Sequence, residues 1–165
     1  MRNIMTIALA ATALVSAVVN AATATTTFAV SATVLKTCSA SANALAFGSY
    51  TPGAGAVAGT TTVSIKCTNG TAYNVALNGG STASGTITQR LMANGTNTLQ
   101  YNLYTTSAYG TIWGDGTTGS TQPGTGAGVA TANTLTVYGQ LPDSATNQGA
   151  VTGSYTDTVT VTVTY

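Results

Sequence analysis

The sequence contains very few charged residues, and it has neither histidine nor glutamate. Charged residues make up 4% of the 165-residue chain, as four Lys or Arg and three Asp. A surface with so little positive charge cannot attract a polyanion, so we expect no nucleic acid partner. The length is that of a single domain.

The same scarcity removes the usual catalytic groups. Without histidine, a Ser-His-Asp or Cys-His arrangement is impossible. The three carboxylates, Asp115, Asp143 and Asp157, each lie in or beside a turn signal, where aspartate is favoured for conformational reasons. Two cysteines without a histidine or a nearby carboxylate cannot complete a tetrahedral zinc site. We therefore predict a protein that is not an enzyme and that binds no metal or cofactor.

Residues 1–21 have the pattern of a secretory signal peptide. Arg2 precedes an apolar stretch at residues 4–19, and residues 19–21 (VNA) fit the small-x-small cleavage pattern. The stretch is shorter than the roughly 20 residues that span a bilayer, and no basic flank follows it. We expect cleavage after Ala21, an exported mature chain and no membrane span after cleavage.

Cys38 and Cys67 are the only cysteines. An even number of cysteines in an exported chain suggests a disulfide, and free thiols are the less favoured alternative. On the chain-entropy model, closing a loop of this length contributes about 3.5 kcal/mol of stability.

Apolar residues recur at every second position along much of the chain, which predicts β-strands. Asn-Gly turn signals and prolines separate the alternating runs, and no helical period competes with them. The pattern predicts an all-β sandwich, with residues 114–130 as a long exposed loop. The residues predicted to share a face are, run by run, Phe28, Val30, Ala32 and Val34; Leu45, Phe47 and Ser49; Val63, Ile65 and Cys67; Tyr73, Val75 and Leu77; Leu99, Tyr101 and Leu103; Leu135, Val137, Gly139 and Leu141; and Val159, Val161, Val163 and Tyr165.

The segment SAYGTIWGDG is the most ligand-like feature. Tyr109 and Trp113 could stack on a sugar face while Asp115 binds hydroxyl groups. A tryptophan beside a glycine-rich turn is more often a structural anchor at a strand end, with its N–H facing water. The structural interpretation is preferred, and the glycan contact stays as an alternative.

Six segments carry a resemblance to a known family. They are FAVSATVLKTCS, ALAFGSYTPGA, VSIKCTNGTAYNVALNGG, LQYNLYTTSAYGTIWGDG, TLTVYGQLP and GSYTDTVTVTVTY, and they cover nearly all of the predicted mature chain. Together they resemble the spore coat protein U domain family, which includes pilin subunits of the archaic chaperone–usher pathway. The cysteine pair and the C-terminal SYTDTVTVTVTY are the most specific parts.

The resemblance implies an immunoglobulin-like β-sandwich that is incomplete because it lacks its last strand. In this family a periplasmic chaperone lends the missing strand, and a neighbouring subunit later replaces it with its own N-terminal extension. The resemblance therefore implies a donor-strand extension at residues 22–35 and a sandwich domain at residues 36–165. The expected donor residues are Phe28, Val30, Ala32 and Val34, and the expected C-terminal groove strand carries Val159, Val161, Val163 and Tyr165.

The function that follows is a structural subunit of a cell-surface pilus or fimbria. The implied partners are a periplasmic chaperone, an outer-membrane usher and other copies of the chain or related pilins. Two alternatives remain open from the sequence. The N-terminal strand could pair within its own domain, and the chain could be a secreted spore-coat or carbohydrate-binding module.

Overall fold

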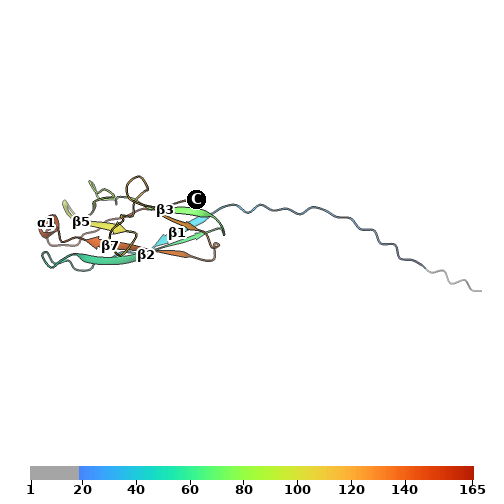
Figure 1. Ribbon diagram of the computed structural model, residues 1–165, viewed down its shortest axis with the longest axis horizontal. Coiled ribbons are helices and arrows are strands. Elements are labelled where there is room, and N and C mark those ends of the chain that lie inside the picture. Colours follow the sequence, from blue (N-terminus) through green and yellow to red (C-terminus); the bar gives the residue numbers. More distant parts are fainter. Residues whose placement is uncertain (1–18) are drawn as a thin grey trace, which may run out of the picture. The chain divides into compact units, whose positions relative to one another are not determined.

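Figure 1 shows the computed structural model, which describes residues 19–165. Most of the predicted signal peptide therefore lies outside the described residues. The chain divides into two units after Thr33, and the second unit, Val34–Tyr165, contains every strand of the described part. No helix within residues 19–165 is long and apolar enough to cross a membrane.

Two antiparallel sheets make up the domain. The larger sheet has five strands in the order β1-β2-β7-β5-β4, and the smaller has three in the order β6-β3-β8. The elements are β1 (Cys38–Ala42), β2 (Val57–Cys67), β3 (Ala72–Leu77), β4 (Arg90–Asn94), β5 (Asn97–Tyr104), β6 (Gln122–Thr125), β7 (Asn133–Leu141), α1 (Ala145–Gln148) and β8 (Val161–Thr164). The predicted all-β class is confirmed, and the sheets form an incomplete immunoglobulin-like sandwich.

Two-residue alternation places the core residues as the sequence predicts. Strand β2 buries every second side chain toward its C-terminal end, and β3 does the same. Strand β5 buries Leu99, Tyr101 and Leu103, and Asn102 between them is buried as well. Successive side chains of a strand point to opposite faces, so an alternating sequence gives one apolar face per sheet. The buried apolar residues are Val63, Ile65, Cys67, Tyr73, Val75, Leu77, Leu99, Tyr101, Leu103, Trp113, Val137 and Leu141.

The predicted disulfide between Cys38 and Cys67 is present in the structure. The two residues face each other in the register of β1 and β2, with their Cα atoms 4.1 Å apart. The bridge therefore ties the first residue of β1 to the last residue of the long strand β2.

Three segments differ from the sequence prediction. Residues 27–34 form no strand, and their side chains are exposed. Residues 45–49 also form no strand, although Leu45 and Phe47 pack against the core. Strand β6 lies inside the segment 114–130 that the sequence predicts to be a loop. These residues are extended because they pair with β3.

The ends of β2 define the two ends of the domain. Its last residue is bonded to Cys38, so the N-terminal segment leaves the domain there. Its first residue, Val57, pairs with Leu141, the last residue of β7, and the short helix α1 begins soon after Leu141 in the chain. Figure 1 shows α1 at the end of the domain opposite to β1.

Candidate functional site

An apolar groove lies between an edge of each sheet. Strand β1 is at the edge of the five-stranded sheet and β8 at the edge of the three-stranded sheet. The groove lies between residues 42–47, where the chain leaves β1, and residues 155–161, which lead into β8, and its volume is about 360 Å³. Its apolar floor and walls come from both sheets and from the segments that adjoin β1 and β8: Ala42, Ala44, Leu45, Phe47, Val63, Leu77, Met92, Tyr101, Leu103, Val137, Tyr155, Val159 and Val161.

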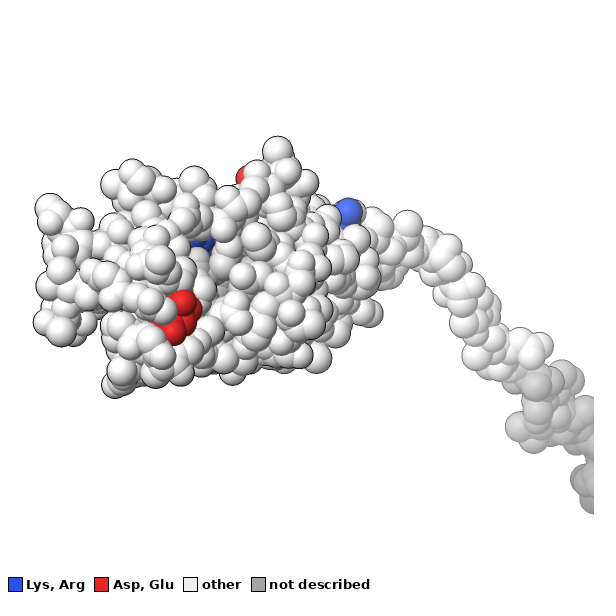
Figure 2. Space-filling model, turned by 60° about the vertical axis from the view of Figure 1, so that its left-hand side comes forward, with Lys and Arg blue, Asp and Glu red and all other residues white. Residues whose placement is uncertain are grey.

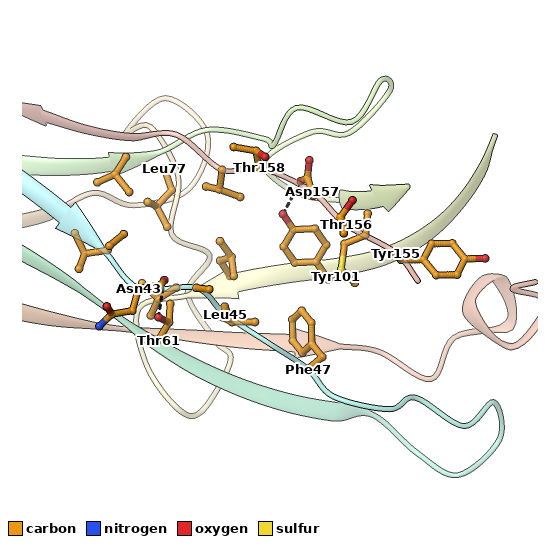
Figure 3. Close-up of a pocket in the computed structure, with 18 residues that line it drawn as sticks. Asn43, Leu45, Phe47, Thr61, Leu77, Tyr101, Tyr155, Thr156, Asp157 and Thr158 are labelled. Carbon is orange, nitrogen blue, oxygen red and sulfur yellow. Dashed lines mark hydrogen bonds between the residues drawn. The ribbon is translucent and has the colours of Figure 1, made fainter. Parts of the chain in front are cut away.

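One wall is the segment that follows β1. It is held by the backbone bond from the Asn43 N–H to the Thr62 carbonyl and by the Thr61 hydroxyl, which donates to the Asn43 carbonyl. Beyond these bonds, Leu45 and Phe47 turn their side chains inward, as Figure 3 shows. The wall is thus shaped by side-chain packing rather than by continued strand pairing.

The other wall is the C-terminal segment. Val159 and Val161 are half-buried and line the groove, while Thr160 and Thr162 are exposed. The structure does not place the whole predicted groove strand there. Val163 packs against the core outside the groove lining, and Tyr165 is 54% exposed because the chain leaves the sheet at that point.

The backbone of the C-terminal segment is bonded on one side only. Thr156 exchanges two hydrogen bonds with Ala93, and Thr160 accepts from the Asn78 N–H. Backbone groups of successive strand residues point to opposite sides. Those of Asp157, Val159 and Val161 therefore point toward the groove, where no strand of the described chain lies beside them.

Tyr101 and Asp157 connect the groove floor to this wall. The Tyr101 hydroxyl donates to the Asp157 carboxylate over 2.6 Å, drawn as a dashed line in Figure 3. The same carboxylate accepts from the N–H and hydroxyl groups of Ser81 and Thr82. Burial raises the pKa of Tyr101, so its hydroxyl stays a donor. Partial burial favours protonation of Asp157, but its hydrogen bonds outweigh that effect and lower its pKa.

A second hollow continues the groove toward the α1 end of the domain. It shares Leu45, Phe47, Met92 and Tyr155 with the groove. Its other apolar lining residues are Ala46, Pro52, Leu99, Leu141, Ala150 and Val151. An extended segment lying in the groove would therefore meet apolar surface beyond Tyr155 as well.

Arg90 is a structural residue that the sequence analysis does not single out. Its guanidinium is fully buried and donates to the Asn102 side chain and to the Asn78 and Trp113 carbonyls. It also donates to the carbonyls of Ile87 and Leu77. A lone arginine in the sequence carries no signal of such a role, because its acceptors come from four separate segments.

The proposed glycan contact does not form a site. Trp113 is fully buried, and its indole N–H donates to the Val75 carbonyl rather than facing water. Asp115 accepts from the N–H groups of Thr117 and Thr118 and so closes its own turn. Tyr109 packs edge-to-face on Tyr104. The ring of Trp113 has no exposed face, which agrees with the preferred structural interpretation of this residue.

The other carboxylate, Asp143, fixes a loop near the α1 end. It accepts from the Tyr50 hydroxyl and from the N–H groups of Gly53 and Gly55. The hydrogen bond from Tyr50 is the largest of the effects that lower the pKa of Asp143. The three aspartates thus act separately in three turns, and no group of acidic residues or cysteines within residues 19–165 could hold a metal ion. Figure 2 shows how few charges interrupt the surface on one face.

The predicted donor residues lie in an extended segment before the domain. Phe28 is 86% exposed and Val30 is 84% exposed, and Val34 is exposed to a similar degree. Exposed apolar surface of this kind is typical of interaction sites. The structure thus contains an apolar groove without a strand and, in the same chain, an exposed apolar segment of matching periodicity.

The family model of the Spore Coat Protein U domain matches residues 24–162. The chain belongs to this family. No curated protein matches it. Among solved structures, it is similar to a chain in the crystal structure of the CsuC–CsuE chaperone–tip adhesion subunit pre-assembly complex, from the archaic chaperone–usher Csu pili of Acinetobacter baumannii. The identity is 25% and the TM-score 0.54, over 81% of this chain and 41% of that chain. The present chain therefore spans less than half of that relative's length.

Proposed function

We propose that this protein is a structural, non-enzymatic subunit of a cell-surface pilus, assembled by strand donation through a chaperone–usher pathway. The observation that carries the proposal is the apolar groove between the segment that follows β1 and the C-terminal segment that leads into β8. Membership of the Spore Coat Protein U domain family and the similarity to a chain of the Csu complex support it.

The groove has the chemistry that an added strand satisfies. An exposed sheet edge presents unpaired N–H and C=O groups, and native proteins cover such edges. A peptide that adds as a strand bonds to these groups, and its alternate side chains fill apolar pockets. Here one inserted strand would border the segment that follows β1 on one side and the C-terminal segment on the other, so it would close the sandwich.

The proposed donor is residues 22–35 of another copy or of a related pilin. Its alternating side chains, Phe28, Val30, Ala32 and Val34, would enter the groove, and Ser31 and Thr33 would face outward. Before assembly, a periplasmic chaperone would fill the groove with a strand of its own. An outer-membrane usher would then supply the site of exchange, and the finished subunit would lie at the cell surface.

The test compares two substitutions in the extension. Val30→Asp places a carboxylate in an apolar groove, where an unpaired charge costs several kcal/mol. Ser31→Asp adds the same charge one residue later, on the opposite face. Each variant is co-expressed with a cognate chaperone and usher, and oligomers are resolved on an unheated detergent gel.

We expect an oligomer ladder for the wild type and for Ser31→Asp, and only monomers for Val30→Asp. Equal ladders for both variants would contradict donation by this segment. A wild type that is monomeric, and that Val30→Asp unfolds, would instead support a self-contained sandwich.

A further inference from the structure

The hydrogen bond between Tyr101 and Asp157 lies part-way along the groove. At its level, the ring of Phe47 stands edge-on against the ring of Tyr101, with centroids 5.9 Å apart. Two aromatic rings and a carboxylate thus surround this one cross-section. Figure 3 shows Leu77 on one side of the cross-section and Tyr155 on the other.

This cross-section is also held rigidly. Tyr101 is nearly fully buried, and Asp157 is fixed by Ser81 and Thr82 as well as by Tyr101. At Gly80, which has a φ of +93°, an added Cβ would lie within van der Waals overlap of the Asp157 carboxylate, so the loop closes tightly around it. The wall cannot move outward at this level without breaking these bonds.

We propose that the Tyr101–Asp157 bridge sets the register of the inserted strand by admitting only a small side chain at its level, and that this residue is Ala32 of a second copy. The inference rests on the strand donation proposed above. Of the four donor residues, Ala32 alone is small, and larger residues flank it on both sides. The groove is likewise apolar on both sides of the bridge.

The register follows from the two-residue spacing. With the donor antiparallel to the C-terminal segment, Ala32 beside Asp157 places Val30 beside Val159. Phe28 then lies beside Val161, in the part of the groove lined by Val63, Leu77 and Val137. At the other end, Val34 reaches the level of Tyr155, where the second hollow begins.

The antiparallel direction follows from where the chains leave. The recipient's own extension leaves at Cys38, beside the last residue of β2. The C-terminal end of an antiparallel donor leaves the groove near Tyr155. Tyr155 lines the second hollow together with Leu141, which pairs with Val57, the first residue of β2. The donor's domain then lies at the free end, and the contact can repeat from copy to copy. A parallel donor would bring its domain to the same end at which the recipient's own extension leaves.

Cysteine pairs on the outward face measure this register directly. In the proposed register Ser31 lies opposite Thr158, which is exposed, unlike its neighbours Asp157 and Val159. On the groove side, Thr158 and Ser31 would form a non-hydrogen-bonded pair, and the Cα atoms of such a pair lie about 4.5 Å apart. That spacing allows a disulfide, whereas diagonal positions at about 7–8 Å do not.

We expect Ser31→Cys with Thr158→Cys to give a ladder that survives boiling without reductant and collapses when reductant is added. Ser31→Cys with Thr156→Cys or with Thr160→Cys, the matched controls, should give monomers after boiling. If either control pair cross-links in place of Thr158→Cys, or if no pair cross-links although the unheated ladder is present, the register is wrong. A wild type without any unheated ladder would overturn strand donation itself.

A size test addresses the bridge. Ala32→Phe should lose the unheated ladder, and Ser31→Phe, with the same ring on the outward face, should keep it. Adding Phe47→Leu to Ala32→Phe makes room at the bridge and should restore the ladder at least in part. An intact ladder for Ala32→Phe would show that the bridge does not select a small residue.

Discussion

Gly59 and Gly139 face each other across β2 and β7 and leave a hollow in the inner face of the larger sheet. A Cβ added at Gly139 would lie 2.8 Å from a methyl carbon of Leu45 and 3.0 Å from the Phe47 ring. A Cβ at Gly59 would lie 3.2 Å from Leu45. The glycine pair thus lets one wall of the groove settle onto the sheet, since that wall has little strand pairing of its own beyond Asn43.

Gly139→Val should therefore push Leu45 and Phe47 into the groove. Overpacking a well-filled site typically costs 1–3 kcal/mol, and we expect a loss of about 2 kcal/mol in the free energy of unfolding. Gly110→Val is the control, because a Cβ there meets open space and its φ is not positive. Urea unfolding of both variants gives the comparison, and equal midpoints would show that the glycine pair does not seat the wall.

Arg90 is the best-satisfied polar group of the core, so its removal should be costly. Arg90→Met leaves the carbonyls of Asn78 and Trp113 without their Arg90 donor, at about 1–3 kcal/mol for each unsatisfied buried group. The Asn102 side chain loses one of its two donors, because the Leu103 N–H still bonds its oxygen. We expect a loss of about 3 kcal/mol or more. Arg90→Lys keeps the charge but not the planar fork, so it should recover only part of this stability. Full recovery by lysine would mean that charge, rather than geometry, is what the site needs.

The sequence predicts the alternating core well because strand period and burial coincide. Val63, Tyr73 and Leu103 lie in runs whose pattern alone places them inside. Strand β6 escapes prediction because its sequence, QPGT, has no apolar alternation, and only pairing with β3 makes it a strand. Trp113 escapes for a similar reason, since the carbonyl that its N–H meets belongs to Val75, far away in the chain.

The groove itself is harder to predict from the residues alone. A missing strand has no sequence of its own in this chain. The alternating pattern therefore predicts the strands on either side of the groove, but it does not predict that a gap lies between them. The resemblance to the family supplied the expectation of an incomplete sandwich. The Tyr101–Asp157 bridge, in contrast, could not be predicted, because nothing in the sequence around either residue indicates that the two side chains meet.

The stability that Asp157 provides should depend on pH in the acidic range. Its pKa is lowered in the folded chain, so the carboxylate contributes stability above the unfolded-state pKa of about 3.9, and this contribution is lost as the pH falls through the folded value. Asp157→Asn should be less stable than the wild type at pH 7. The difference between their urea midpoints should shrink below about pH 4. A difference that stays constant from pH 7 to pH 3 would exclude the carboxylate as its source.

The disulfide should matter more for yield than for the shape of the groove. Cys67→Ser breaks a bridge whose loss typically costs 2–5 kcal/mol in a small exported domain. We expect much less folded protein in the periplasm, while the chain that does fold keeps its oligomer ladder. Thiol labelling of the unreduced, denatured wild type should find no free cysteine, and full labelling would contradict the bridge.

The C-terminal segment offers the sharpest matched pair for the groove wall. Val161 is half-buried against the core and lines the groove, whereas Thr162 is exposed on the opposite face. Val161→Asp brings an unpaired carboxylate into the apolar wall, which costs several kcal/mol whether or not a strand fills the groove. Thr162→Asp adds the same charge in water and should change the free energy of unfolding by no more than about 0.5 kcal/mol. We expect Val161→Asp to remove most of the exported protein from periplasmic extracts, as measured by immunoblot, and Thr162→Asp to leave its amount near that of the wild type. Equal losses for the two variants would mean that the alternation of this segment does not define the wall.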